Sequence, residues 1–350
     1  MISQLPATMP VAVFGRRSIA VEERPVPALE PHDVLVEVGY CGVCGSDLHF
    51  VIDGWGSPGS IGGHEWSGVV AAVGSEVSQW SVGDRVVGGV NSCGSCRYCR
   101  AGRPTLCAGR GRVGSGEWQG AFAGYVREHE QALNRIPDGL SPRVAALAEP
   151  LAVALHGITL SGAQPGQRIL VTGAGPIGSL VTAALLARGI TGVTVSEPGD
   201  RRRRLAAELG AATVTPEQLV APDWPSSVVD EPFDAVLECS GRADAMEAAL
   251  GQLAVAGTLV LVGAGIVPPR FDPNRIILNE LVVTGAFCYD SDGFTDALEL
   301  LAGGRLATDL LIEDDDVPLT GLFAAMEGLA GGDIAGKVMV AGPMGRHDDP

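Results

Sequence analysis

The pattern of apolar and polar residues divides the chain into two regions. Up to about residue 90, short apolar runs such as 34–38 are broken by Gly and Pro, which predicts many short strands. From about residue 165, compact apolar runs such as 168–172 and 258–262 are separated by helical stretches. Continuous apolar strands between helices are typical of a parallel sheet that is covered on both faces. The chain is therefore predicted to be an α/β protein with two domains.

The expected elements follow this division. The first region is predicted to contain strands at 11–14, 19–23, 34–38, 67–74 and 83–87. The second is predicted to alternate strands at 168–172, 192–197, 233–238, 258–262 and 281–285 with helices at 179–188, 201–209 and 243–253. The apolar run 144–160 predicts a buried helix with Pro150 near its start. The C-terminal part is predicted to hold helices at 294–301 and 319–329, strand segments at 310–317 and 337–340, and a disordered tail at 345–350.

A glycine-rich turn follows the strand predicted at 168–172. Its sequence is Gly173-Ala174-Gly175-Pro176-Ile177-Gly178, and an acid, Glu197, ends the next strand 19 residues after Gly178. Such a turn is weak evidence alone, but between a strand and a helix, with an acid at this distance, it is typical of dinucleotide binding. The glycines permit close approach of a pyrophosphate, and the helix N-terminus offers N–H groups to the phosphates.

The stretch 39–49 carries most of the candidate catalytic chemistry. Glycines end the strand before it, and the following residues offer a thiol, a hydroxyl, a carboxylate and an imidazole: Cys44, Ser46, Asp47 and His49. A second glycine-flanked cluster, His64-Glu65, begins fifteen residues after His49. A thiolate, an imidazole and nearby carboxylates are what zinc takes when one coordination position stays open. Residues 41–44 also match a redox C-x-x-C motif, which is disfavoured because no thioredoxin-like βαβ pattern surrounds it.

Glu149 is a lone carboxylate in the apolar run 144–160. A carboxylate is costly to bury unless it is paired or bound to a metal. Two interpretations remain open at this stage, because Glu149 can be a zinc ligand or can only cap its helix. His156, in the same run, is interpreted as a packed core histidine.

Four cysteines cluster between residues 93 and 107. Cys93, Cys96, Cys99 and Cys107 have the spacing C-x2-C-x2-C-x7-C in a glycine-containing loop. Four thiolates close a tetrahedral shell around zinc and leave no open position, so this site is predicted to be structural. The rival interpretation is an iron–sulfur cluster, which also takes four cysteines. The eight cysteines of the chain could alternatively form disulfides, but their clustering favours metal binding in a reducing cytoplasm.

Charge and hydropathy narrow the classes of partner. The net charge is −17, from 24 basic and 41 acidic side chains, which argues against nucleic acid and anionic membranes as partners. No uninterrupted apolar run approaches 18 residues, and the N-terminus shows no secretory signal pattern, so we expect neither a membrane span nor export. The basic run 201–204 is interpreted as a solvated helix face.

Taken together, these motifs resemble one family, the zinc-dependent medium-chain dehydrogenases and reductases. The resemblance spans nearly the whole chain and is closest to the butanediol, sorbitol and threonine dehydrogenase branches. It rests on the segments 42–49, 63–65, 93–107, 148–152, 173–178 and 336–338, which occur in family order and spacing. The family implies a GroES-like β-barrel catalytic domain formed by residues 1–152 and 288–350. A Rossmann NAD-binding domain of doubly wound parallel sheet is then expected at 153–287.

The resemblance also implies roles for the site residues. Cys44 and His64 are expected to hold a catalytic zinc, with Glu65 or Glu149 completing its shell and Asp47 orienting a ligand. Glu149 is favoured as the resting ligand. Ser46 is expected to pass the proton and His49 to carry it towards solvent; alone, these two would be interpreted as a turn hydroxyl and a surface imidazole.

The implied cofactors are two zinc ions per chain and NAD. Cofactor-binding residues are predicted to be Gly173, Gly175, Pro176, Ile177, Gly178, Glu197, Arg202, Cys239 and Gly263. Glu197 favours NAD by accepting from a ribose hydroxyl, whereas Arg201 and Arg202 leave NADP as the weaker alternative.

The expected function is reversible oxidation of a secondary alcohol, polyol or sugar-like alcohol in a cytoplasmic homo-oligomer, either a dimer or a tetramer. Two alternatives were weighed: a non-catalytic zinc-stabilised nucleotide-binding redox sensor, and a zinc-free quinone or enoyl reductase. The first is disfavoured because every catalytic role has a candidate residue, and the second because of Cys44, His64 and the cysteine cluster. The segments 50–60, with Trp55, and 110–122, with Trp118, are expected to shape the substrate pocket.

Overall fold

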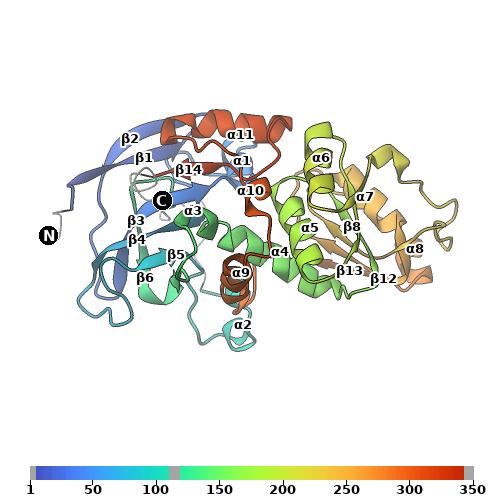
Figure 1. The fold of residues 1–350 in the computed structure, drawn as a ribbon, viewed down its shortest axis with the longest axis horizontal. Helices are drawn as coiled ribbons and strands as arrows, with labels where there is room; N and C mark the ends of the chain where they lie inside the picture. Colours follow the sequence, from blue (N-terminus) through green and yellow to red (C-terminus); the bar gives the residue numbers. More distant parts are fainter. Residues whose placement is uncertain (1–4, 110–118, 343–350) are drawn as a thin grey trace.

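The structure is a computed structural model that describes residues 5–109 and 119–342. Two lobes lie side by side along the longest axis, with both chain ends in the same one (Figure 1). Trp118 and the predicted disordered tail at 345–350 lie outside the described residues.

The second lobe is built on a six-stranded parallel sheet. Across the sheet its strands are β10 (Ala212–Val214), β9 (Gly192–Ser196), β8 (Arg168–Thr172), β11 (Phe233–Glu238), β12 (Leu253–Leu261) and β13 (Val282–Gly285). Helices of this lobe are α5 (Pro176–Ala187), α6 (Asp200–Glu208), α7 (Ala243–Gly251) and α8 (Pro273–Leu278). The strand order reverses between β8 and β11, where parallel sheets of this kind bind ligands. The predicted doubly wound sheet is confirmed.

The first lobe holds an antiparallel sheet that uses both chain ends. Its strands are β14 (Met339–Ala341), β3 (Asp33–Gly42), β4 (Glu65–Val73), β5 (Arg85–Val87) and β7 (Asn134–Arg135), with β6 (Tyr125–His129) paired to β3. A hairpin of β1 (Thr8–Phe14) and β2 (Ile19–Pro25) adds to it. Strand β14 runs antiparallel to β3, with Met339 opposite Gly42. The C-terminal segment therefore returns to the strand that leads into the predicted catalytic stretch.

A buried helical stretch joins the lobes. It comprises α3 (Pro142–Ala145) and α4 (Ala148–Ser161), and α4 packs against α5 and against α9 (Gly293–Ala302). Among the described residues, only 142–161 is long and apolar enough to cross a membrane, with a mean hydropathy of 1.5. That stretch is 72% buried inside the protein, as expected for a core helix. The predicted buried helix is confirmed, and Pro150 lies in its first turn.

One predicted element is wrong. Residues 310–317 do not form a strand: they contain α10 (Thr308–Leu311) and then touch their neighbours at two isolated bridges, Ile312–Lys337 and Val317–Val340. Three consecutive carboxylates, Asp314 to Asp316, lie between the bridges. Like charges in such a row repel one another and cannot be buried in a ladder, so the chain bows outward there. The helix predicted at 319–329 is confirmed as a 3-10 turn followed by α11 (Leu322–Gly331).

Candidate active site and metal centres

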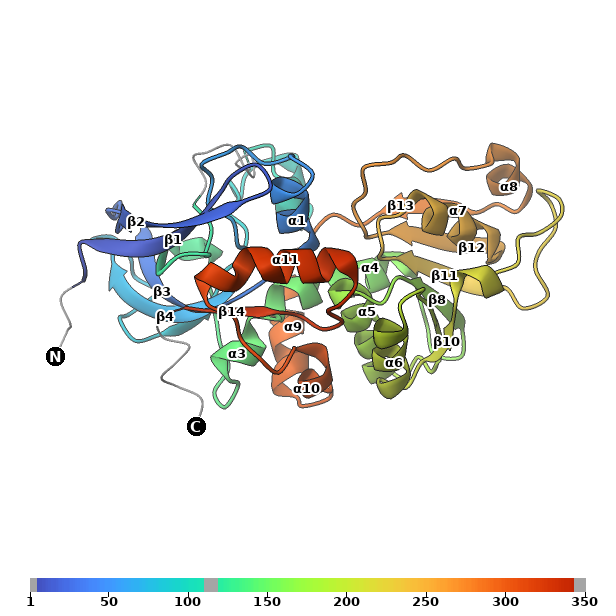
Figure 2. The ribbon, with the colours of Figure 1, turned by 90° about the horizontal axis from the view of Figure 1, so that it is seen from above.

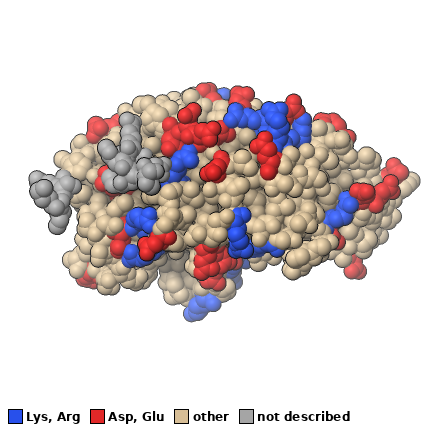
Figure 3. All heavy atoms as spheres, in the orientation of Figure 1, with Lys and Arg blue, Asp and Glu red and all other residues tan. Residues whose placement is uncertain are grey.

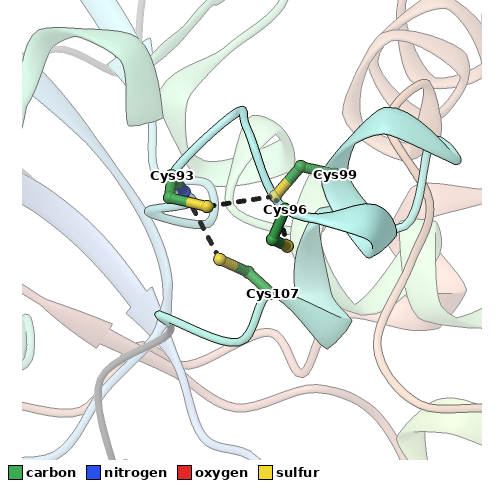
Figure 4. A group of neighbouring side chains, drawn as sticks. All are labelled: Cys93, Cys96, Cys99 and Cys107. Atoms are coloured by element: carbon green, nitrogen blue, oxygen red, sulfur yellow. Dashed lines mark hydrogen bonds between the residues drawn. The ribbon is translucent and has the colours of Figure 1, made fainter.

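The four clustered cysteines converge on one point (Figure 4). Their sulfur atoms all lie within 4.8 Å of one another, with Cys96 Sγ 3.5 Å and Cys93 Sγ 4.0 Å from Cys99 Sγ. A tetrahedral zinc shell with Zn–S bonds of about 2.3 Å has S–S edges of about 3.8 Å. The thiols thus fit a single zinc ion, whereas a cluster of several irons would hold them farther apart. All eight cysteines lie within the described residues, and none of them forms a disulfide there.

Local hydrogen bonds prepare this cluster for a cation. The side chain and backbone of Ser95 stabilise the Cys93 thiolate and lower the pKa of Cys93 to about 6. The backbone amides of Cys93 and Gly109 point at Cys107 Sγ, at 3.4 and 3.3 Å. Deprotonated thiols are the form that binds metal, so the loop favours the ligand state at Cys93, whereas burial raises the pKa of Cys99 to about 11.

The mixed site is assembled at the junction of three elements. Cys44 is the N-cap of α1 (Gly45–Val51), and Glu65 begins β4, directly opposite Gly42 of β3. The metal-binding atoms of Cys44, His64 and Glu65 all lie within 4.8 Å of one another. Glu149, in the first turn of α4, is not a member of that close group. The structure therefore brings three of the four predicted ligands together and leaves the choice between Glu65 and Glu149 as a prediction.

The electrostatics of the mixed site fit a dication. Desolvation alone would lower the pKa of His64, but the Cys44 thiolate and the Asp47 carboxylate raise it well above its usual value. Burial raises the pKa of Glu149 to about 7, with the neighbouring Glu65 adding to the effect. In addition, the Glu65 side chain is fully buried beside Cys44 and His64. A thiol, an imidazole and a buried carboxylate in this arrangement are ligands that zinc takes in proteins.

Lys337 was not predicted as a site residue. Its side chain is 2% exposed, and its Nζ lies 2.7 Å from Glu65 Oε1 and 2.6 Å from Oε2. Burial alone would lower the pKa of Lys337, but Glu65 and then Cys44 raise it above its ordinary value, so the amine is an ammonium. The only sequence signal was its place in the family segment 336–338.

Asp47 holds the turn around the mixed site. It is fully buried, and its carboxylate accepts from the backbone N–H groups of Cys44, at 3.1 Å, and Gly63, at 3.4 Å. Its Oδ1 also lies 4.0 Å from His64 Nδ1. Burial raises the pKa of Asp47, while the bonds to these N–H groups act in the opposite direction. Its position matches the predicted orienting role, which stays a prediction.

The two predicted proton-relay residues lie on α1 beside the mixed site. Ser46 is half-buried in the first turn of the helix. His49 Nδ1 lies 2.7 Å from Asp53 Oδ2, and its ring stacks on Trp55 with the centroids 4.6 Å apart. His49 Nε2 lies 3.2 Å from the carbonyl oxygen of Ala264, which follows β12 in the other lobe. This contact brings α1 against the edge of the parallel sheet where its strands end.

The glycine turn has the geometry of a phosphate-binding loop. Gly173 has φ +87°, a conformation that side chains rarely adopt, and a Cβ on Gly178 would lie 1.9 Å from the Gly173 carbonyl oxygen. Gly175 is the N-cap of α5 and Pro176 its first residue, with Ile177 next. The free N–H groups of this helix start therefore face the carboxyl ends of the strands.

Glu197 lies beside this loop, at the end of β9. Its Oε2 accepts from the N–H of Ala174 and its Oε1 from the N–H of Gly199, both at 2.8 Å. The carboxylate is thus fixed next to the turn, where a ribose would follow the pyrophosphate. Cys239 and Gly263 come directly after β11 and β12 at the same edge of the sheet. The structure gathers these predicted cofactor residues at one crevice.

Arg202, another predicted cofactor residue, contacts the C-terminal part of the chain. Its guanidinium donates to the carbonyl oxygens of Leu329, at 2.8 Å, and Ile334, at 3.1 Å. These bonds tie α6 to the C-terminal end of α11, which reaches the junction of the lobes (Figure 2). A role at the cofactor, which stays a prediction, would require Arg202 to leave them.

Figure 3 shows a basic patch in the region of α6, next to acidic groups, and Arg201 and Arg204 of the basic run 201–204 on this helix are exposed. Two of its members are ion-paired, Arg201 with Glu313 at 2.7 Å and Arg203 with Asp200. The run is therefore partly a contact between lobes and not only a solvated helix face.

Glu238 is a further buried carboxylate that sequence reasoning did not select. It ends β11, is fully buried, and accepts from the N–H groups of Ser240, at 2.8 Å, and Gly241, at 3.1 Å. These bonds shape the turn after β11 at the crevice. The signal in the sequence was an acid at a strand end, the same signal that selected Glu197.

Comparison with known proteins gives the family. The alcohol dehydrogenase GroES-like domain family matches residues 30–138, and the zinc-binding dehydrogenase family matches residues 176–303. The chain belongs to the zinc-dependent medium-chain dehydrogenases, in their polyol dehydrogenase branch. The resemblance stated from the sequence and the expected pairing of a GroES-like with a Rossmann domain are confirmed.

Individual relatives agree over nearly the full length. A sorbitol dehydrogenase from Bacillus subtilis (strain 168) is 34% identical over 336 residues, which span 90% of this chain and 92% of that protein. A zinc-binding dehydrogenase from Sinorhizobium meliloti 1021, solved bound to NADP, superposes with a TM-score of 0.84 at 31% identity, covering 96% and 100% of the two chains. An acetophenone reductase from Geotrichum candidum NBRC 4597, in complex with NAD, gives a TM-score of 0.86 at 25% identity, covering 97% and 98%.

Proposed function

We propose that this chain oxidises a secondary alcohol, polyol or sugar-like alcohol to the ketone, reversibly, with NAD as the hydride acceptor. The observation that carries the proposal is the contact of His49 with Ala264, at 3.2 Å. It brings the helix of the mixed metal site to the carboxyl ends of the parallel strands, where a dinucleotide binds. A substrate at the metal site then lies close to the cofactor, as hydride transfer requires.

Each residue has a distinct task in this proposal. Cys44, His64 and a carboxylate would hold a zinc ion, which would supply Lewis acidity to the substrate hydroxyl. Ser46 accepts the hydroxyl proton, and His49, whose Nδ1 lies 2.7 Å from Asp53 Oδ2, carries it towards solvent. Asp47 holds the backbone of Cys44 and Gly63 in place. The four-cysteine site stabilises its loop and takes no part in the chemistry.

NAD is the proposed cofactor because of the carboxylate at the end of β9. Glu197 is fixed beside the glycine turn and can accept from the ribose 2′-hydroxyl, whereas a 2′-phosphate would meet like charge. Relatives of this chain have been solved with either nucleotide, so the family alone does not set the preference.

The proposed domains remain residues 1–152 with 288–350 for the GroES-like domain and residues 153–287 for the Rossmann domain. The boundary between residues 152 and 153 lies within α4.

The test is a panel of sorbitol, xylitol, butanediol, simple secondary alcohols and amino alcohols, assayed in both directions with NAD and NADP. Polyols are the expected best substrates, since a relative with that activity is 34% identical. The proposal fails if purified, zinc-loaded protein binds nucleotide but turns over none of these compounds. In that event the nucleotide-binding sensor would be the remaining interpretation.

We also infer that the protein is a homo-oligomer. Strand β13 is the edge of the parallel sheet, and four large apolar side chains near it are 51–69% exposed: Val255, Ile277, Leu278 and Val282. An exposed apolar edge strand invites pairing with a second copy. Light scattering should show a dimer or tetramer that Val282→Lys weakens, whereas Val82→Ser, at an exposed apolar residue of the other lobe, should leave the mass unchanged. A monomeric wild type would refute this.

A further inference from the structure

Lys337 is a charged side chain buried in the floor of the mixed metal site. Its Nζ donates to Glu65 Oε1 at 2.7 Å and to the carbonyl oxygen of Val43 at 3.0 Å. Glu65 itself is 0% exposed. Burying a charge pair costs several kcal/mol per ion before the attraction offsets it, so such a pair is no strong source of stability. Its presence next to Cys44 and His64 calls for a different reason.

The backbone around Lys337 is fixed, which fixes the ammonium. The N–H of Lys337 donates to the Leu311 carbonyl oxygen at 2.8 Å, and the N–H of Glu313 donates to the Lys337 carbonyl oxygen at 2.9 Å. Glu313 Oε1 also accepts from the N–H groups of Ala335 and Gly336, at 3.0 and 2.7 Å. Lys337 therefore enters the site from a segment that is held on both sides.

Glu65 is confined just as closely. It lies opposite Gly42, where a Cβ would approach Glu65 Oε2 to 2.3 Å and Lys337 Cδ to 3.1 Å. Lys337 Nζ lies 2.7 Å from Oε1 and 2.6 Å from Oε2, so the ammonium contacts both carboxylate oxygens. The ammonium thus holds the carboxylate of the side chain that is grouped with Cys44 and His64.

We propose that Lys337 is a positioning residue that holds the Glu65 carboxylate beside the catalytic metal and offsets its charge. Its ammonium competes with the metal for electron density on Glu65, which keeps this ligand displaceable. The inference rests on the proposed catalytic metal site, because it concerns how that site holds its metal. Lys337 touches neither substrate nor cofactor in this proposal and acts mainly through Glu65, with a smaller direct repulsion between the ammonium and the dication.

The test measures metal release from the mixed site, independently of turnover. The variants are Lys337→Met, Glu65→Gln and the double variant, which leaves no buried charge unpaired and so protects the fold. Release of zinc to a coloured chelator is timed, and the absorption bands of protein whose mixed site carries cobalt(II) report the ligand set. Glu313→Gln serves as the matched control, since it loosens the same segment without removing the ammonium.

Lys337→Met is expected to slow metal release by roughly threefold to tenfold and to shift the cobalt bands, because Glu65 becomes a stronger donor. In the Glu65→Gln background the same substitution should have a much smaller effect on both quantities, because only the direct repulsion between the ammonium and the metal ion is then removed. The proposal is overturned if Lys337→Met acts equally in both backgrounds, if it has no effect, or if Glu313→Gln reproduces it. A wild type that binds zinc only at the four cysteines would overturn the catalytic metal site and this inference together. If wild type binds two zinc ions and is active, but Lys337→Met changes neither metal release nor the cobalt bands, only the inference about Lys337 fails.

Discussion

The two predicted metal sites of this chain are built in opposite ways. The four-cysteine site takes every ligand from residues 93–107, with sulfur atoms that are partly exposed and already spaced for one zinc ion. The mixed site collects Cys44, His64 and Glu65 from one part of the chain and Lys337 from 272 positions beyond Glu65. Its Glu65 and Lys337 are buried, whereas Cys44 and His64 are partly exposed.

This difference separates two uses of the same metal. A site made from one loop can stabilise that loop but has little influence on its surroundings, and four thiolates leave no position for a substrate. A site assembled from distant segments depends on the whole fold, and the fold in turn sets its charge. The carboxylates of Glu65 and Glu149 and the buried ammonium of Lys337 then adjust how firmly the metal is held.

The largest expected effect contrasts the sites directly. Cys44→Ala should lower kcat/KM by ~10³-fold or more, because Lewis-acid stabilisation worth several kcal/mol is lost. Its melting temperature should remain close to that of the wild type. Cys96→Ser should instead lower Tm by roughly 5 °C or more, since zinc binding there is folding energy. Steady-state kinetics and thermal melts measure the two effects; a fully active Cys44→Ala would contradict the site.

Metal removal should separate the sites in time. Wild type should contain about two zinc ions per chain, and a chelator should take the mixed-site ion first, because that site has an open position while the thiolate shell is closed. Activity should fall with loss of the first ion, before any change in circular dichroism. Simultaneous release of both ions would show that the sites are not independent.

Glu149→Gln tests which carboxylate completes the mixed shell. Glu149 is the resting ligand favoured by the sequence, but Glu65 is the carboxylate grouped with Cys44 and His64. If Glu149 is the ligand, the variant should lose zinc faster and lose activity by about 10–100-fold. If zinc affinity and rate are normal, Glu65 fills the position. Glu299→Gln, on exposed α9 surface, is the control.

A substitution of Glu197 should change the preference for NAD over NADP by a smaller factor than the metal-site variants change activity. Glu197→Ala should lower the NAD-over-NADP ratio of kcat/KM about tenfold, as expected for one hydrogen bond to a charged acceptor and relief of repulsion. The measurement is kcat/KM with each nucleotide for wild type and variant. An unchanged ratio, or preference for NADP in wild type, would remove Glu197 from this role.

The smallest expected effect concerns the link between the cysteine loop and α4. Burial, and then the charge of Arg103, lower the pKa of His156, whose Nε2 lies 3.4 Å from the Arg103 guanidinium. The unfolded chain therefore binds a proton more readily than the folded one, and stability should fall as the pH drops below about 6.5. His156→Gln should flatten this part of the Tm-against-pH curve. If the Tm-against-pH curve of His156→Gln ran parallel to that of the wild type, the prediction would be contradicted.

The sequence by itself determined the local features. Gly173 to Gly178 must turn tightly between a strand and a helix, and the four cysteines can meet without help from distant segments because they share one stretch of fifteen residues. Apolar strands alternating with helices fixed the parallel sheet. Each of these depends on neighbours along the chain, so pattern and spacing were sufficient.

Only the tertiary structure decided the rest. Lys337 gave no chemical signal in sequence, because its meaning comes from burial beside Glu65 across the β3–β14 pairing. Arg202 was assigned to the cofactor by its distance from Glu197, but the fold engages it with Leu329 and Ile334. The segment 310–317 has strand-like ends, yet its carboxylates keep its middle out of the sheet. In each case the deciding energy is desolvation or pairing of a charge, which depends on what surrounds the residue in space.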